Sequence, residues 1–291
     1  MCDESMLEQN AAYLRQREVS RRQFGALSVG AGLVATLPRA ANAQDVTETE
    51  VEIETPDGTA DCYFVHPSSG SYAAVLVWPD ILGLRTSFRQ MGRRLAESGY
   101  SVLVVNPFYR NARAPVVAEG ASFQDESVRN TVFPLAQSLS AQTHVTDATA
   151  FINWLDEQAA VDSSRGVGTT GYCMGGPMVM RTVAARADRV RAGATFHGGG
   201  LVTEADNSPH LLIPQMNASL LHAVAANDDE SDPEAKNVLR ESYSDAGLSA
   251  EIEVYEGALH GWCPPDSAVY NEPQAERAWS RLLVLFESAL A

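Results

Sequence analysis

The side chain best placed to act as a nucleophile is Cys173, within the segment Gly-Tyr-Cys-Met-Gly-Gly at 171–176. A β-like run at 166–170 precedes this segment, and a helix-like run at 177–185 follows it. A strand, a tight glycine-flanked turn and a helix together hold a nucleophile above the end of a sheet. The N-terminus of the helix also favours a thiolate. The pattern predicts a catalytic thiol, and a buried cysteine in a glycine-rich turn is the alternative.

A nucleophilic thiol needs a base and an orienting acid close to it in space. His260 follows a strand-like run at 250–255, and Asp228 and Asp229 follow another at 220–225. Sites in open α/β sheets form at the carboxyl ends of such strands. We therefore predict His260 as the base. Asp228 is the preferred acid because it lies nearer the expected strand end, and Asp229 is the alternative.

Two backbone N–H groups are expected to bind the oxyanion of an acyl-transfer intermediate. One is that of Met174, directly after the thiol, and the other is that of Ile81, in the loop after the buried run 73–78. Asp80 precedes Ile81 and has two interpretations. Its carboxylate primes the thiol by accepting or holding the thiol proton, or it caps the next helix. Of the remaining histidines, only His197, followed by three glycines, is kept as a reserve candidate.

Strand-like and helix-like runs alternate along the chain. Strands are expected at 73–78, 101–105, 166–170, 192–197, 220–225 and 250–255, and helices at 85–98, 145–155, 177–185, 233–246 and 273–290. A hairpin at 47–65 precedes them, and 107–126 is expected to be a long loop. This alternation predicts an α/β fold with one doubly wound, mainly parallel sheet. Residues 44–291 contain no evident linker and are expected to form one domain.

The charge balance limits the partners. The chain has 291 residues, with 37 acidic against 21 basic side chains and a net charge of -16, which argues against nucleic acid. None of the four cysteines lies in a pattern typical of a zinc site, and the sequence contains no cofactor motif, so neither a metal nor a cofactor is expected.

Residues 1–43 read as an export signal. Arg21 and Arg22 form a twin-arginine pattern, the apolar run 26–37 follows, and Ala-Asn-Ala at 41–43 is a typical cleavage signal. The apolar run is shorter than the roughly 20 residues that a spanning helix needs. We expect export by the twin-arginine machinery to the periplasm or beyond, with no stable membrane anchoring after cleavage.

Four segments of the chain resemble the dienelactone hydrolase family of α/β-hydrolases, also called carboxymethylenebutenolidases. They are Gly-Tyr-Cys-Met-Gly-Gly at 171–176, Pro-Asp-Ile-Leu-Gly at 79–83, Glu-Ser-Gly-Tyr at 97–100 and Ala-Leu-His-Gly at 258–261. The resemblance spans roughly residues 50–290. It implies an α/β-hydrolase fold and a triad of Cys173, His260 and Asp228.

The resemblance also implies substrate-binding groups. The family binds the carboxylate of its substrate with two arginines, of which Arg129 matches one, whereas Pro264 stands at the position of the other. The acid that primes the thiol is a glutamate in the family, and the shorter Asp80 stands there. We expect a hydrolase that cleaves a small ester or lactone through a thioester. A non-catalytic binding protein on the same fold and a thiol-dependent acyltransferase are the alternatives.

Overall fold

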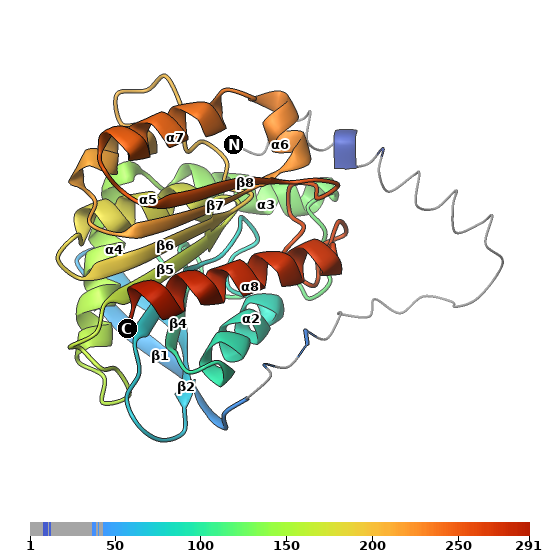
Figure 1. Ribbon diagram of the computed structural model, residues 1–291. Coiled ribbons are helices and arrows are strands. Elements are labelled where there is room, and N and C mark those ends of the chain that lie inside the picture. The colour runs from blue at the N-terminus through green and yellow to red at the C-terminus, as the bar shows by residue number, and fades with distance from the viewer. Residues whose placement is uncertain (1–7, 11, 13–36, 39, 41–42) are drawn as a thin grey trace.

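The computed structural model describes residues 8–10, 12, 37–38, 40 and 43–291. The predicted signal peptide, residues 1–43, therefore lies almost wholly outside the described residues. Within the described part, one eight-stranded sheet has the order β1-β2-β4-β3-β5-β6-β7-β8 (Figure 1). The strands are β1 (Val46–Thr55), β2 (Gly58–Pro67), β3 (Ala74–Trp78), β4 (Ser101–Val105), β5 (Val167–Tyr172), β6 (Val190–Phe196), β7 (Ser219–Ala225) and β8 (Ala250–Tyr255).

The two N-terminal strands form the predicted hairpin. β1 pairs with β2 and β2 with β4 in antiparallel fashion, whereas every pair from β4 to β8 is parallel. Strands β3 and β4 are buried along their whole length, as expected for apolar runs covered on both faces. The predicted doubly wound, mainly parallel sheet with an N-terminal hairpin is confirmed.

Helices cover both faces of the sheet (Figure 1). They are α2 (Thr86–Glu97), α3 (Glu126–Gln137), α4 (Ala141–Asp156), α5 (Gly175–Ala185), α6 (Ala226–Ser231), α7 (Ala235–Asp245) and α8 (Glu272–Ala289), with a 3₁₀ segment, η1, at Pro209–Gln215. Helices α2 and α8 pack with one face of the sheet to form one core. Helices α4, α5 and α7 pack with the other face to form the second core.

Helix α3 is absent from the sequence prediction, which expected only a loop at 107–126 and nothing regular before 145. Pro134 lies inside α3, and an internal proline normally ends a helix because it removes a backbone donor. The helix is stabilised by tertiary contacts, since its buried Val132 packs on Ile81 and Leu82. Helix α4 begins at Ala141, earlier than predicted, because Ser140 and Thr143 form a capping box.

The parallel strands bring the candidate residues to one edge of the sheet. β3, β5, β7 and β8 are parallel members of the same sheet, so their carboxyl ends point the same way. The segments that follow them carry Asp80, Cys173, Asp228 and His260, respectively, with Asp228 already in α6. Asp80 and His260, 180 residues apart in sequence, therefore lie beyond the same edge.

Candidate active site

The turn between β5 and α5 holds Cys173 in a conformation that few residues adopt. Its φ is 53°, in the left-handed region, where a side chain other than glycine is strained. The flanking glycines are required by close packing. A Cβ on Gly171 would lie 2.3 Å from the carbonyl oxygen of Gly175, and one on Gly175 would lie 2.5 Å from that of Trp78. The sequence pattern thus reflects a turn compressed against β3.

His260 lies between an acid and the thiol. Its Nδ1 is 2.8 Å and 3.0 Å from the two carboxylate oxygens of Asp228. Its side chain also hydrogen-bonds with that of Cys173. Only 7% of the His260 surface is exposed. The thiol, the imidazole and the carboxylate therefore form a continuous chain, in the arrangement that nucleophilic acyl transfer requires.

The geometry separates the two candidate acids. Asp228 contacts His260, whereas Asp229 forms an ion pair with Lys236 in the first turn of α7. Both acids lie in α6, where successive residues point about 100° apart around the helix axis. A helical turn directly after β7 therefore directs one carboxylate towards the histidine and its neighbour away from it.

Asn227 is a positioning residue that the sequence prediction did not identify. Its side chain is buried, and its Oδ1 accepts a hydrogen bond from the backbone N–H of His260 at 2.8 Å. The N–H of Ala226 also donates to the carbonyl of Ala258 at 2.9 Å. These two bonds fix the loop that follows β8 against the start of α6, so the distance between His260 and Asp228 is set by backbone contacts as well as by the side chains.

Opposing effects determine the charge of His260. Burial disfavours the imidazolium and lowers the pKa, whereas the negative charges of Asp228 and of the Cys173 thiolate raise it, as do the hydrogen bonds to both. The charges and hydrogen bonds prevail, and the pKa of His260 lies well above its ordinary value of 6.5. The site therefore favours a protonated imidazole next to Cys173.

Asp80 lies near the thiol but is held by other groups. Its Oδ1 accepts the N–H of Leu82 at 2.9 Å, and Arg85 donates to both carboxylate oxygens at 2.7 Å and 2.9 Å. Arg85 also binds Asp266 through two hydrogen bonds. The cap residue of α2 is Arg85, with no side-chain cap bond, so Asp80 caps its own turn rather than the helix. The sequence analysis missed Arg85 and Asp266.

Two cavities meet at the thiol. The smaller, of about 270 Å³, is lined by Asp80, Arg85 and Asp266 together with Cys173 and His260. The larger, of about 640 Å³, is lined by Cys173, His260 and a mostly apolar wall that comes from α3, α5 and η1. A substrate carbonyl at the thiol would therefore have space on both sides for the two groups that it joins.

The remaining predicted residues lie at different distances from this centre. Ile81 lines both cavities and Met174 lines the larger one. Within the described part of the chain, no hydrogen bond uses the N–H of Ile81. Arg129, by contrast, donates to the carbonyls of Phe123 and Gln124 and lines neither cavity.

His197, the reserve candidate, packs against the site. It follows β6 with a φ of 41°, and its ring lies edge-on to those of His260 and Trp262, with centroids 4.9 Å and 5.2 Å away. Burial and the neighbouring His260 lower the pKa of His197 well below its ordinary value, so its ring is neutral. Neither ring nitrogen has a hydrogen-bond partner among the described residues. His197 is therefore a packing support for His260.

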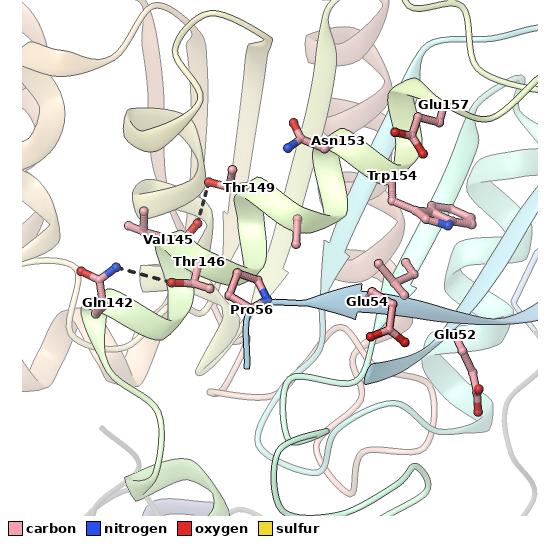
Figure 2. A pocket seen from close by; sticks show the side chains of 12 residues that line it. Glu52, Glu54, Pro56, Gln142, Val145, Thr146, Thr149, Asn153, Trp154 and Glu157 are labelled. Carbon is pink, nitrogen blue, oxygen red and sulfur yellow. Dashed lines mark hydrogen bonds between the residues drawn. The ribbon is translucent and has the colours of Figure 1, made fainter. Parts of the chain in front are cut away.

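A third hollow, of about 710 Å³, lies away from this centre between β1 and α4 (Figure 2). It contains three glutamates, Glu52, Glu54 and Glu157, but none of the candidate catalytic residues.

Elsewhere, Cys62 and Cys263 are buried thiols outside any disulfide, and burial raises the pKa of each. Cys173 is thus the described cysteine with a histidine beside it.

In the described ranges, no cluster of three or more histidine, cysteine, aspartate or glutamate side chains is arranged to hold a metal ion. The helices described there also lack the combination of length and apolar character needed to cross a membrane.

Comparison with known proteins places this geometry in context. The family model for the dienelactone hydrolase family matches residues 60–290. A protein of Synechocystis sp., provisionally named carboxymethylenebutenolidase, is 27% identical over 250 residues, which cover 84% of this chain and 98% of the relative. A Bradyrhizobium protein, provisionally named 2-oxo-3-(5-oxofuran-2-ylidene)propanoate lactonase, is 25% identical and covers 80% of this chain and 91% of its own.

Solved structures support the same fold. A crystal structure from Klebsiella pneumoniae, provisionally titled a dienelactone hydrolase, superposes with a TM-score of 0.73 at 22% identity. The match covers 84% of this chain and 99% of that one.

Proposed function

The chain belongs to the dienelactone hydrolase family and is a hydrolase of esters or lactones, and from this premise we propose that it acts through a Cys173–His260–Asp228 triad with a thioester intermediate. The observation that carries the proposal is the chain of contacts from Asp228 through His260 to Cys173 at the meeting point of two cavities. Cys173 in its strained turn supplies the nucleophile.

The first half of the proposed reaction forms the thioester. The Cys173 thiolate attacks the carbonyl carbon of the substrate, and the carbonyl electron pair moves to the oxygen. The N–H groups of Ile81 and Met174 are proposed to donate hydrogen bonds to this oxyanion. The oxyanion then collapses, the bond from carbon to the leaving oxygen breaks, and His260 donates its proton to that oxygen.

The second half returns the enzyme to its starting state. Neutral His260 takes a proton from water, and the resulting hydroxide adds to the thioester carbonyl. The carbon–sulfur bond breaks, so the acid product leaves and Cys173 returns as a thiolate beside a protonated His260. Asp228 fixes the Nδ1–H tautomer of the imidazole and stabilises its charge in both steps.

Asp80 and Arg129 keep proposed accessory roles. Asp80 lines the same cavity as Cys173, and its negative charge would affect the proton of the thiol if Arg85 released it. Asp80→Asn should then change the pH dependence of thiol alkylation, and an unchanged profile would exclude priming. Arg129 is proposed to bind a substrate carboxylate, and an unchanged KM for carboxylate esters in Arg129→Met would argue against that role.

The test of the triad is hydrolysis of 4-nitrophenyl acetate and of a small unsaturated lactone by the wild-type protein and by Cys173→Ala. We expect turnover in the wild type and a loss of about 10³-fold or more in the variant, because a triad acts as a unit. Mass spectrometry of a quenched reaction should detect an acetyl group on Cys173. Equal turnover by both proteins would refute the proposed nucleophile.

The export segment gives a separate proposal. We propose that residues 1–43 direct the chain through the twin-arginine machinery to the periplasm or beyond, and that the hydrolase acts there without a membrane anchor. Its support is the order of the arginine pair, the apolar run and the small-residue cleavage signal. Fractionation of cells that express the wild type and a variant with Arg21→Lys and Arg22→Lys tests it. Equal export of both would contradict it.

A further inference from the structure

Arg181 is a buried cation whose charge has no acidic partner in the described structure. It lies in α5, eight residues after the thiol, and only 9% of it is exposed. The described ion pairs engage many of the other arginines but do not include this one. Burial lowers the pKa of its guanidinium, and no neighbouring charge is among the causes. An arginine nevertheless stays protonated in proteins.

The hydrogen bonds of Arg181 leave much of the guanidinium available. One Nη atom donates to the carbonyl of Asn207 at 3.1 Å, and the other lies 3.4 Å from Nδ1 of His144. The Nε atom is buried without a partner. Arginine has five N–H donors, so at least three are not used by the described residues. A buried cation left in this state is costly, and an anion would offset the cost.

Arg181 lines the larger of the two cavities at the thiol. Met174, Pro177 and Arg181 all face that cavity, at the spacing of one side of α5. None of the residues that line it is an aspartate or a glutamate. Burial, Arg181 and Arg110 lower the pKa of the adjacent His144 to about 3, so His144 is neutral and adds no charge. Apart from Cys173 and His260 at its inner end, Arg181 is therefore the charged group of this cavity.

Helix α5 gives the scale of the wall that runs from the thiol to Arg181. Arg181 lies seven positions after Met174, a rise of roughly 10 Å along the helix axis at 1.5 Å per residue. The wall between them is mainly apolar, with Phe133, Leu139 and Pro209 among its members. A ligand that spans this wall needs an apolar chain with an anionic group at its far end.

We propose that Arg181 selects ester substrates that carry a carboxylate at the far end of an apolar chain, with that chain filling the larger cavity. The proposal rests on the proposed hydrolase function of Cys173 and adds the substrate class. It places an anion-binding group on α5 that is separate from Arg129, which lines neither cavity.

Matched esters test this selection. The anionic probes are the mono-4-nitrophenyl esters of adipate, suberate and sebacate, whose chain lengths bracket the expected span. The neutral probe is 4-nitrophenyl octanoate, which has the length of the suberate ester without its charge. We expect Arg181→Met to lower kcat/KM for the preferred anionic ester by about 10- to 100-fold, since a charge-assisted bidentate contact is lost. The value for octanoate should change by no more than about threefold.

Two further variants complete the design. Arg181→Lys keeps the charge without the planar fork and should recover part of the preference. Arg240→Met removes the charge of an exposed arginine on α7 that lines neither cavity, so it should keep the wild-type ratio of anionic to neutral rates. Equal losses on anionic and neutral esters in Arg181→Met, or no loss on either, would overturn the proposal.

The same experiment separates this proposal from the hydrolase function beneath it. If the wild type hydrolyses octanoate but shows no gain with any anionic ester, the substrate class is wrong and the triad stands. If it hydrolyses none of the four esters, the triad is in doubt. Calorimetry of suberate binding then tests the role of Arg181 without the need for turnover. Suberate bound by the wild type and lost in Arg181→Met supports the anion site, and no binding to either refutes it.

Discussion

Asp228→Asn should impair catalysis strongly, whereas Asp229→Asn should not. The two residues are adjacent in α6, and their side chains are 19% and 21% exposed, so the same substitution is made in closely matched surroundings. Only Asp228 contacts His260, at 2.8 Å and 3.0 Å, whereas Asp229 pairs with Lys236. The comparison therefore isolates the contact with the histidine.

The expected loss follows from the burial of that contact. His260 carries a positive charge in the transition state, and we take the loss of its acidic partner to raise the barrier by about 3–5 kcal/mol, as for breaking a buried ion pair. At about 1.4 kcal/mol for each factor of ten, this corresponds to a fall of about 10²- to 10⁴-fold in kcat/KM. An asparagine also presents an N–H₂ group that favours the wrong tautomer of His260. Loss of the Asp229 pair, at a partly exposed site, should change kcat/KM by no more than about threefold.

Two assays measure this effect. The first is kcat/KM for 4-nitrophenyl acetate, and the second is the rate of iodoacetamide alkylation of Cys173 between pH 5 and 9. Asp228 raises the pKa of His260, so its loss should weaken the thiolate–imidazolium pair and slow alkylation near neutral pH. Burial raises the pKa of Cys62 and Cys263, so both should react slowly. A fully active Asp228→Asn, or equal losses in both variants, would refute the assigned acid.

Two further predictions concern stability. Gly175→Ala should lower the free energy of unfolding by about 1–3 kcal/mol, because the added Cβ would lie 2.5 Å from the Trp78 carbonyl oxygen and 3.0 Å from that of Pro79. Urea titration measures it, and an unchanged midpoint would show that β3 can move away. The unfolding free energy should also fall between pH 6.5 and 5, because burial holds the pKa of His144, His197 and His222 below 6.5 while the unfolded chain takes up their protons. Each of these three histidines contributes a slope approaching about 1.4 kcal/mol per pH unit to the unfolding free energy. His222→Gln should remove the contribution of one of them. His260 opposes this slope near pH 6.5, because its pKa is raised in the native state while the unfolded chain is only partly protonated there, and its contribution vanishes towards pH 5. A slope unchanged in His222→Gln would contradict this account.

Local pattern in the sequence was sufficient to predict the N-terminal hairpin and the parallel strands that follow it. Continuous apolar runs marked strands that are covered on both faces, such as β3 and β4, because only buried strands can be apolar at every position. Glycines on either side of Cys173 predicted a compressed turn, because a Cβ at Gly171 or Gly175 would collide with backbone. These features depend on neighbours in sequence, so they can be read from it.

Tertiary contacts determined what the sequence left open. Helix α3 was not predicted because its apolar side is satisfied by the loop of Ile81 and Leu82, about 50 residues away. The choice of Asp228 over Asp229 depended on the angle at which α6 leaves β7. The pairing of Asp80 with Arg85 and Asp266 was equally invisible, since Asp266 lies 181 residues from Arg85.

The sequence by itself determined the family, the nucleophile turn and the order of the candidate triad, because each depends on residue types at short and fixed spacing. Only the tertiary structure decided how these residues meet. It placed His260 between Asp228 and Cys173, it held Asp80 with Arg85, and it buried the charge of Arg181 in the wall of a cavity. Burial and charge pairing depend on groups brought together from distant parts of the chain, and no local pattern specifies which groups those are.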